Sequence, residues 1–507
     1  MKFIVRDIPL KLVSASVMLN PDDVLELGLV SGDRVKVVDH KKSCVKDVHI
    51  ATEMLKRGEL GFCKTSGPCD MYVAEGETVE VFPVSRPASI DFIKKKMTGK
   101  KLDKDEITAI IQDIGDNMLN EVEITAFVMA NYFQNIDFDE TEWMTRAMIE
   151  SGEKISFDRD TVVDKHSIGG VPGNKITLLV VPIIAASGLL IPKTSSRAIT
   201  SASGTADTME VLADVTLDIK EIQEITNRLG GVITWGGSTN IAPVDDIIIQ
   251  VERHLSIDPK PQLLASIMAK KGAIGAKHVV IDIPVGEGTK VPEIKYGREL
   301  ANDFTRMGQR LGLNIACVMT YGGQPVGRAI GPALEAREAL AALETVSSSP
   351  KSLAEKAVGV AARLLEMSGK TQNGTEHALK MLSSGKALEK FRQIVEAQGG
   401  HAILKSSDIP IGDKTFDVTA PVDGSIARVE NSRLVRIARA AGAPRDRGAG
   451  ILLHKKGGHH VKAGDVLFTV YAEKEWKLSQ AIGMIEREPP LAVSGMILES
   501  FPTYQTL

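Results

Sequence analysis

Two polar segments of the sequence carry the residue types expected of an anion-binding site. Residues 163–170 read Val-Asp-Lys-His-Ser-Ile-Gly-Gly, and residues 195–207 contain one arginine and six hydroxyl side chains. Each segment ends an apolar or β-prone run and precedes a helical pattern, so each is predicted to link a strand to a helix. Such loops turn backbone N–H groups and the positive end of a helix toward an anion, and Lys165 and Arg197 add full charges. Together the segments indicate two faces of a phosphate-binding pocket, although either one alone is equally well an ordinary polar loop.

A second group of chemical residues lies on one predicted helix. Asp258 precedes two prolines, of which Pro261 can begin a helix. Ser266 and Lys270 are four residues apart on that helix and share one face. A carboxyl, a hydroxyl and an ammonium group on one element can hold and protonate a heteroaromatic base. The alternative is an N-capping aspartate followed by a surface Ser–Lys pair.

Lys290 follows the glycine-rich residues 285–289 at the end of a predicted strand, residues 278–284. Open α/β sheets bind their ligands at this end of the strands, but a flexible loop with one lysine is also common on protein surfaces. Residues 169–175 fall short of a P-loop because Asn174 stands in place of its second glycine. The sequence also contains no dinucleotide-binding fingerprint, serine-hydrolase elbow or zinc-ligand helix.

The elements that position these residues form several domains, because 507 residues are too many for one hydrophobic core. Period-two alternation near the N-terminus resembles a small double-psi β-barrel, a fold that can serve in docking or oligomerisation. A helical pattern follows, and then an α/β pattern that predicts a central, mostly parallel sheet. The C-terminal region is β-rich again and resembles a barrel-sandwich module. The predicted domains are an N-terminal β-barrel (1–86), an α-helical domain (87–155 plus about 245–275), an α/β phosphate-binding domain (156–244 plus 276–410) and a C-terminal α+β domain (411–507).

Composition excludes several kinds of partner. The formal net charge of −4 argues against nucleic acid, which is usually bound by a basic domain or stripe. Residues 1–5 read as a strand rather than a signal peptide, and no apolar run reaches membrane-spanning length. Four cysteines are too few and too scattered for a disulfide framework or a zinc site. We therefore expect a reduced, cytoplasmic protein that binds neither membranes nor metals.

The spacing of these motifs resembles the thymidine/pyrimidine nucleoside phosphorylase family over nearly all of the chain after residue 88. The matching residues are those of 163–170, Ser195, Arg197, Gly204, Thr205, Asp207, Glu210, Ser266, Lys270, Lys271, Lys290 and Gly323-Gln324-Pro325. The resemblance implies a split α domain, an α/β domain and a C-terminal domain. It also implies cleavage of an N-glycosidic bond by phosphate, with dimerisation through the α domain.

The resemblance carries site residues over to this sequence. It implies orthophosphate contacts at Lys165, Ser167, Thr177, Ser195 and Thr205, and contacts around the base at His166, Ser266 and Lys270. Two positions depart from the pyrimidine enzymes: Val251 replaces an arginine, and residues 198–203 replace glycines and a histidine with three hydroxyls. Those hydroxyls can hold a second phosphate, and with the N-terminal barrel they make the chain resemble the archaeal AMP phosphorylases.

In that subfamily the matching positions bind the nucleotide, with Asp258 as proton donor and His166 as the alternative acid. The implied nucleotide contacts are Gly170, Ser196, Arg197, Ala198, Ile199, Thr200, Ser201, Thr205, Ser266, Lys270 and Lys290. The expected reaction is phosphorolysis of nucleoside 5′-monophosphates (AMP, with CMP and UMP as further candidates) to free base and ribose 1,5-bisphosphate. No cofactor is expected because lysine and arginine supply the positive charge, and a homodimer or higher homo-oligomer is expected to form through the N-terminal domain.

Three other functions remain open at this point. The nearest is a thymidine or pyrimidine nucleoside phosphorylase that yields a (deoxy)ribose 1-phosphate. A phosphoribosyl transferase on a similar fold would need diphosphate and Mg²⁺. A nucleotide-binding regulator would have kept the fold and lost catalysis.

Overall fold

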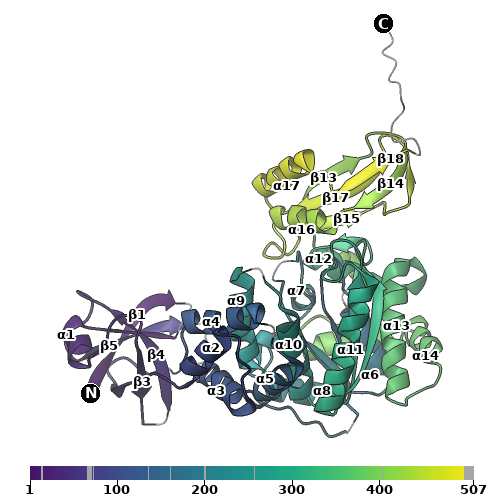
Figure 1. Cartoon of the computed structure of the whole chain (residues 1–507). Coiled ribbons are helices and arrows are strands. Elements are labelled where there is room, and N and C mark those ends of the chain that lie inside the picture. Colours follow the sequence, from purple (N-terminus) through teal and green to yellow (C-terminus); the bar gives the residue numbers. More distant parts are fainter. Residues whose placement is uncertain are drawn as a thin grey trace. The chain divides into compact units, whose positions relative to one another are not determined.

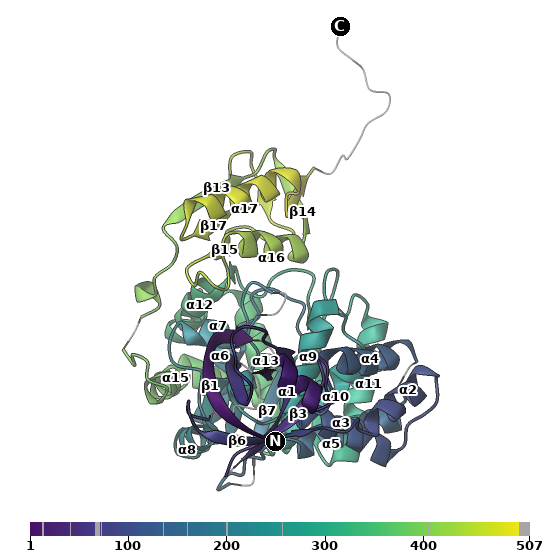
Figure 2. The ribbon, with the colours of Figure 1, turned by 90° about the vertical axis from the view of Figure 1, so that its left-hand side faces the viewer.

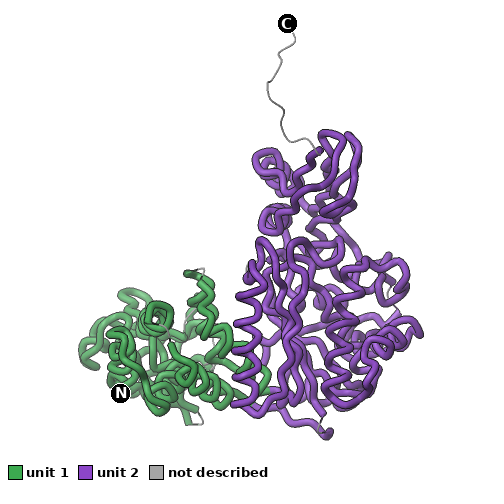
Figure 3. The backbone as a smooth tube through the Cα atoms, turned by 45° about the vertical axis from the view of Figure 1, so that its right-hand side comes forward, with its two compact units in different colours: residues 1–153, 240–273 green, residues 154–239, 274–507 purple. Residues whose placement is uncertain are grey.

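The computed structural model describes residues 1–12, 15–40, 42–65, 71, 73–134, 136–159, 161–198, 201–255, 257–403 and 405–495. The chain forms two compact units, each built from separate stretches of sequence (Figure 3). The first unit comprises residues 1–153 and 240–273, and the second comprises residues 154–239 and 274–507. No described helix is both long enough and apolar enough to cross a membrane.

The first unit begins with a closed six-stranded barrel, drawn in purple in Figure 1 and turned toward the viewer in Figure 2. Its strands are β1 (Lys2–Leu12), β2 (Ser16–Leu19), β3 (Arg34–Val38), β4 (Ser43–Ile50), β5 (Glu59–Thr65) and β6 (Thr78–Pro83), in the order β1-β5-β2-β4-β3-β6. The pairs β1–β5 and β2–β4 are parallel and the others antiparallel. Helix α1 (Pro21–Glu26) starts at Asn20, whose side chain accepts a hydrogen bond from the Asp22 amide.

Cys44 on β4 is disulfide-bonded. The thiols of Cys63 and Cys317 are free. The sequence-based expectation of a fully reduced protein is therefore wrong at Cys44. Spacing along the chain does not predict a disulfide, because its formation depends on the distance between the Cα atoms of two cysteines.

The rest of the first unit is a helical bundle. Its helices are α2 (Ser89–Met97), α3 (Lys104–Gly115), α4 (Glu121–Phe133), α5 (Phe138–Glu150), α9 (Pro243–Leu255) and α10 (Lys260–Ala273). Asp103, Asn120 and Asp137 begin α3, α4 and α5, each in a capping box with the glutamate three residues later. The later helices α9 and α10 join the same core, because Val244, Ile248 and Ala265 pack with the buried residues of α3–α5.

The second unit is built on parallel strands with helices between them. The strands are β7 (Val163–Ser167), β8 (Ile191–Ser195), β9 (Gly231–Trp235), β10 (His278–Val285) and β11 (Asn314–Tyr321). They pair in the orders β11-β10-β7 and β8-β9, and a parallel bridge between Val162 and Leu190 links β7 to β8. All pairings within these two sheets are parallel, as the sequence pattern predicts.

The helices of this α/β part bury the sheet. They are α6 (Thr177–Ala186), α7 (Thr205–Glu210), α8 (Ile219–Leu229), α11 (Ile294–Leu311), α12 (Pro332–Glu344), α13 (Lys351–Met367), α14 (Gly374–Ser383) and α15 (Lys386–Ala397), with short 3₁₀ turns η1 (Gly236–Ser238), η2 (Val346–Ser348) and η3 (Ser406–Asp408). Helix α6 is apolar on all sides and its first nine residues are buried. It therefore forms the centre of the core, between the strands and α12, α13 and α15.

The C-terminal part of the second unit contains two small antiparallel sheets and two helices. Its elements are β13 (Lys414–Thr419), β14 (Gly424–Val429), α16 (Asn431–Ala440), β15 (Gly450–Leu453), β16 (His460–Val461), β17 (Val466–Ala472), α17 (Glu475–Arg487) and β18 (Leu491–Ser494). The first sheet has the order β12-β15-β17-β13 and the second β16-β14-β18. Strand β12 (Ala329–Ile330) comes from the α/β part, so the two parts share a sheet.

Candidate active site

The two hydroxyl-rich segments follow neighbouring strands. Strands β7 and β8 run parallel and are linked by the Val162–Leu190 bridge, so the loops after Ser167 and Ser195 leave the same edge. The loops after β10 and β11 leave this edge as well, because these strands are parallel to β7. The geometry is that of a ligand site at the carboxyl ends of parallel strands.

A buried polar network supports the loop after β7. Lys165 is 3% exposed within the strand, and His166 and Ser167 are half-buried at its end. The Asn174 amide donates a hydrogen bond to the Ser167 hydroxyl at 2.9 Å and a longer one, at 3.3 Å, to Asp282 on β10. The hydrogen bond from Asn174, which also bonds Asp282, thus fixes the position of the Ser167 hydroxyl.

Asp282 is the centre of that network and carries a negative charge. It accepts a hydrogen bond from Thr320 at 2.6 Å and forms an ion pair of 2.8 Å with Lys356 on α13. Burial acts to raise the pKa of Asp282, but the ion pair with Lys356 and hydrogen bonds from Lys356, Thr320 and Ser167 outweigh burial, so its pKa lies below the ordinary value.

Two hydroxyls at this edge are buried without a hydrogen-bond partner among the described residues. They are Thr177 Oγ1, on the first residue of α6, and Ser195 Oγ, at the end of β8. The carbonyl oxygen of the Asn174 side chain is likewise buried without a hydrogen-bond partner among the described residues. Buried polar atoms are nearly always hydrogen-bonded in folded proteins. These hydroxyls are therefore suited to receive a ligand such as an oxyanion.

The loop after β8 is closed by one carboxylate. Asp207 on α7 accepts hydrogen bonds from the backbone amides of Ala198, at 2.6 Å, and Gly204, at 2.8 Å. A side chain at position 204 would come within 2.6 Å of the Ser196 carbonyl, so only glycine fits there. Asp207 therefore holds both ends of the loop, in which Ser196 is exposed and Ser201 half-buried. Of the predicted contacts, Ile199 and Thr200 lie outside the described residues.

Arg197 forms ion pairs within the protein. Its guanidinium donates to both carboxylate oxygens of Glu210, at 2.6 and 2.7 Å, and lies 4.8 Å from the centre of the Trp235 ring. The pKa of Glu210 is lowered, chiefly by the hydrogen bond from Arg197. A bidentate pair of this kind has a defined geometry. It anchors the loop to α7.

The loops after β7 and β10 approach each other closely. Gly170 has φ of +87°, and a Cβ there would lie 2.7 Å from the backbone nitrogen of Lys290. Lys290 itself is exposed. The structure thus brings the predicted contacts Gly170 and Lys290 together, and it does so through a glycine that leaves room for the neighbouring backbone.

The first unit contains a separate group of predicted residues. Ser266 donates a hydrogen bond of 2.9 Å to Asp245, and Lys270 forms an ion pair of 2.8 Å with the same carboxylate. Burial acts to lower the pKa of Lys270, but Asp245 and Asp246 outweigh it and raise that pKa, so Lys270 is charged. Asp258 lies in the segment between α9 and α10 and is exposed.

The C-terminal part of the second unit contacts the loops of the site. Arg439 on α16 donates to the Ser201 carbonyl at 3.0 Å, and Arg447 forms an ion pair of 3.2 Å with Glu210. Asn431 donates to the Gly322 carbonyl, in the loop after β11, at 2.8 Å. This part of the chain therefore supports two of the four loops at the edge.

Several residues that support the site were not predicted from the sequence. They are Asn174, Asp245, Asp282, Thr320 and Lys356, and Asp207 was matched only as part of a motif. Each is a polar residue on or beside an apolar element, and a buried position of this kind needs a partner. The sequence does not show which partner it has.

Comparisons with known proteins match three parts of the chain. Residues 90–152 match the helical bundle domain of a glycosyl transferase family, residues 159–388 its α/β domain, and residues 425–491 the pyrimidine nucleoside phosphorylase C-terminal domain. AMP phosphorylase 1 of Archaeoglobus fulgidus is 58% identical, covering 97% of this chain and 98% of that protein. The AMP phosphorylase of Methanocella arvoryzae is 52% identical, covering 95% and 96%.

A solved structure shares the fold of the central part. Anthranilate phosphoribosyltransferase from Thermus thermophilus aligns with a TM-score of 0.52 and 19% identity. The alignment covers 61% of this chain and 100% of that one.

Proposed function

The chain belongs to the AMP phosphorylase family of glycosyl transferases, and we propose on that premise that it cleaves AMP with orthophosphate. The products are adenine and ribose 1,5-bisphosphate, which makes the protein a pentosyltransferase. The observation that carries the proposal is the pair of buried hydroxyls of Thr177 and Ser195, which have no hydrogen-bond partner among the described residues and lie at the edge that also bears Lys165. An oxyanion held there accepts their hydrogen bonds and balances the lysine charge.

The mechanism follows from the charges that develop. As the glycosidic bond breaks, C1′ gains positive charge and the leaving base gains negative charge. Orthophosphate held beside Lys165, Ser167, Thr177 and Ser195 attacks C1′, and its fixed position lowers the entropic part of the barrier. Thr205, at the start of α7, is proposed as a further phosphate contact. The chain's own cations supply the positive charge, so we propose that no metal or other cofactor takes part.

The 5′-phosphate of AMP is proposed to bind the loop after β8. Its hydroxyls on Ser196 and Ser201 are donors for a phosphate ester, and Asp207 fixes both ends of the loop. Gly170 and Lys290, which pack against each other, are proposed to contact the nucleotide as well. This loop is the feature that separates a nucleotide substrate from a nucleoside.

The base is proposed to bind the face of α10. Ser266 and Lys270 are held by Asp245, so their polar groups have fixed positions. We propose Asp258 as the proton donor to the leaving base, with His166 as the alternative, because general acid catalysis contributes about 10²–10⁴-fold. Val251, where the pyrimidine enzymes have an arginine, is 5% exposed in the core of the bundle and offers no charge to a pyrimidine.

We also infer the four-domain division expected from the sequence, with a double-psi type for the barrel and a barrel-sandwich type for the C-terminal sheets. The barrel is proposed to mediate homo-oligomer formation. It exposes several large apolar side chains, among them Leu25 at 80%, Val30 at 65% and Ile4 at 46%, which are costly to leave in water. Location in the cytoplasm stays a prediction.

A substrate comparison tests the function. The protein is incubated with orthophosphate and, separately, AMP, CMP, UMP, adenosine, uridine and thymidine, and release of the free base is measured. Phosphate-dependent base release from AMP, unaffected by EDTA, is the expected result. Turnover of nucleosides without nucleotides would assign the chain to the nucleoside phosphorylases. A Mg²⁺ requirement together with diphosphate would indicate phosphoribosyl transfer.

A further inference from the structure

A cavity of about 570 Å³ lies in the second unit, and none of the residues assigned above to the catalytic site lines it. Its wall contains the basic side chains of Arg328, Lys351, Lys456 and His459. The one carboxylate in the wall, on Glu338, already bonds the ammonium of Lys175, which is fully buried. The volume lies within the range of about 300–1,000 Å³ that is usual for small-molecule sites.

Three cations of this wall, Arg328, Lys351 and Lys456, form no ion pair with a residue that the structure describes, because the carboxylate of Glu338 is paired with Lys175. The Arg328 and Lys351 side chains are exposed and form no ion pair with a described residue. Lys456 donates to the carbonyls of Pro325, at 2.7 Å, and Gly327, at 3.0 Å, which leave its charge unbalanced. An anion that enters the cavity therefore meets three cations that form no ion pair with a described residue.

The surroundings of Lys456 lower the pKa of its ammonium group. Burial lowers its pKa to about 8, and the neighbouring charges of Lys175 and Arg328 lower it further than Glu338 restores it. An anion beside Lys456 would favour the protonated form. The ammonium group is thus placed where a ligand charge would lower its free energy.

The start of helix α13 forms another part of the wall. Ser348, Ser349 and Ser352 line the cavity, and Pro350 precedes the helix without a side-chain cap. The Ser349 hydroxyl is buried without a hydrogen-bond partner in the described ranges. Free N–H groups and a helix dipole favour negative charge at such a position.

We propose that this cavity binds a phosphate-bearing small molecule of nucleotide size, separately from the catalytic site. The three cations neutralise the phosphate, the hydroxyls of Ser349 and Ser352 and the first turn of α13 donate to its oxygens, and the remaining volume holds the organic part. Inorganic phosphate, a sugar phosphate and a nucleotide share this chemistry, and the experiment below separates them.

The cavity is connected to the catalytic edge by the loop after β11. Lys456 holds the carbonyls of that loop, and the Gly457 amide donates to Gln324 at 3.0 Å. On its other side the loop bonds the segment after β7, because the Val326 amide donates to the Pro172 carbonyl at 3.1 Å. A ligand in the cavity is therefore expected to change the rate of AMP cleavage. This effect on the rate rests on the proposed function, whereas binding to the cavity is independent of it.

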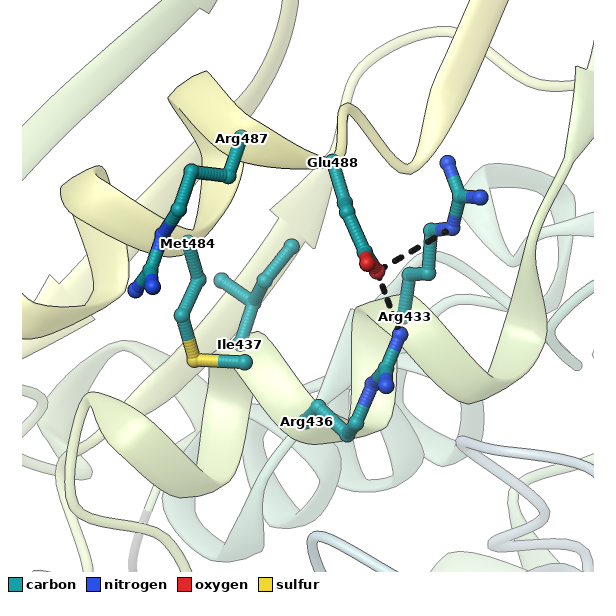
Figure 4. Close-up of a pocket in the computed structure, with 6 residues that line it drawn as sticks. All are labelled: Arg433, Arg436, Ile437, Met484, Arg487 and Glu488. Atoms are coloured by element: carbon teal, nitrogen blue, oxygen red, sulfur yellow. Dashed lines mark hydrogen bonds and ion pairs between the residues drawn. The ribbon is translucent and has the colours of Figure 1, made fainter.

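A smaller cavity on the C-terminal part offers a matched control. It has a volume of about 180 Å³ and is lined by Arg433, Arg436 and Arg487 together with Glu488 (Figure 4). Arg436 pairs with Glu488 at 2.8 Å and Arg433 with the same carboxylate at 3.7 Å. Here Arg433 and Arg436 already share a counter-charge, and the volume is smaller, so this cavity is not expected to bind the ligand.

The first experiment counts binding sites on the full-length protein by equilibrium dialysis. AMP, ribose 5-phosphate and inorganic phosphate are tested separately, each without the other substrate of the reaction. For at least one organic phosphate we expect a second site per chain, weakened at least tenfold in the R328Q/K351Q variant. The R436Q/R487Q variant, which loses the same charge, should keep it. A single site per chain for every probe, or equal loss in both variants, would overturn the proposal, and a second site that accepts only inorganic phosphate would refute the nucleotide-sized ligand.

The second experiment locates the site independently of activity. Pyridoxal 5′-phosphate carries a phosphate and an aldehyde that reacts with unprotonated lysines, and borohydride makes the adduct permanent. Peptide mapping at pH 8 should find Lys456 modified, with protection by the organic phosphate that gave the second site. Absence of modification at Lys456, or modification without protection, would contradict the assignment. If AMP is not cleaved but Lys456 is labelled and protected, the proposed function fails while this site stands.

Discussion

Lys270 and Asp245 form an ion pair of 2.8 Å between helices α10 and α9. Asp245 is 1% exposed and also accepts the hydrogen bond from Ser266. One buried carboxylate thus sets the positions of both side chains that are proposed to contact the base. The removal of one partner of such a pair is costly because the other charge is left buried.

We expect Asp245→Asn to lower kcat/KM for AMP by about tenfold to a hundredfold, because Lys270 and Ser266 lose their common anchor. Steady-state kinetics with varied AMP and saturating phosphate measure this. Asp246→Asn is the control, since Asp246 lies at 3.4 Å from Lys270 and is more exposed, and it should have a smaller effect. Equal losses in the two variants would argue against a special role of Asp245.

Thr177→Val is expected to raise KM for phosphate by about tenfold or more without lowering the melting temperature. The Thr177 hydroxyl is buried without a described partner, so its removal costs the folded state no hydrogen bond, whereas a bound phosphate loses one. Thr226→Val is the matched control, because the Thr226 hydroxyl on α8 is also buried and unpartnered among the described residues but is not a predicted contact. An unchanged KM in Thr177→Val would exclude this hydroxyl from phosphate binding.

Gly170→Ala is expected to reduce kcat/KM at least tenfold more than Gly169→Ala. Both glycines have φ near +87°, so both substitutions bring the same backbone strain of about 1–2 kcal/mol. Only at Gly170 would the new Cβ meet the Lys290 backbone; at Gly169 nothing lies within 4 Å. Kinetics and thermal unfolding of the two variants separate the contact from the strain, and similar activities would show that the approach of the two loops is unimportant.

Asp207→Asn is expected to raise KM for AMP more than KM for phosphate. The Ala198 and Gly204 amides donate to the same carboxylate oxygen, and the other oxygen lies 3.5 Å from the Arg197 guanidinium. An amide nitrogen cannot accept a hydrogen bond, so the Asn side chain loses either both backbone hydrogen bonds of the loop after β8 or the contact with Arg197. The comparison is Asp214→Asn, an exposed aspartate that accepts a hydrogen bond from the Thr216 amide. A uniform fall in kcat with both KM values unchanged would not fit a loop that binds the nucleotide.

Glu335→Gln is expected to stabilise the protein above pH 7 and to have no effect near pH 4.5. Burial raises the pKa of Glu335 to about 7, with the Lys175 charge and a hydrogen bond from Gly331 opposing it. Between pH 4.5 and 7 the folded state therefore binds more protons than the unfolded state, so the free energy of unfolding falls as pH rises through this window. The loss amounts to roughly 2–3 kcal/mol above pH 7, and the amide variant avoids it.

Denaturant unfolding of Glu335→Gln and the parent at pH 5, 6, 7 and 8 tests this window. The exposed Glu299 offers a control, Glu299→Gln, that should follow the parent at every pH. A variant that is less stable than the parent at pH 8 would contradict the prediction.

Much of the architecture is predictable from hydrophobic periodicity. The strand expected at residues 278–284 is β10 (His278–Val285), and the helix expected near Pro261 is α10 (Lys260–Ala273). Strands β2 and β5 were not predicted. β2 has only four residues, and β5 contains Gly61, where a Cβ would come within 2.7 Å of the Ile8 side chain. Close packing rather than strand propensity therefore determines that residues 59–65 form a strand.

The sequence predicts candidate site residues where they follow strands in recognisable motifs. It does not predict which residues form hydrogen bonds or ion pairs with them. At one edge of the sheet lie Lys165, Thr177 and Ser195, which were predicted as phosphate contacts from the family resemblance. The partners Asp245 and Asp282 were not, because each contact joins residues far apart in the sequence. The ion pair between Arg197 and Glu210 was also not predicted, because the sequence shows both charges but not that they neutralise each other.

Strand β12 is provided by the α/β part but hydrogen-bonds to β15 of the C-terminal sheet, with Ala329 opposite Leu452 and Ile330 opposite Ile451. A protein cut between these regions would carry one half of a broken ladder on each fragment. Both fragments would then expose backbone groups that recruit foreign strands, so they are expected to precipitate rather than behave as independent modules.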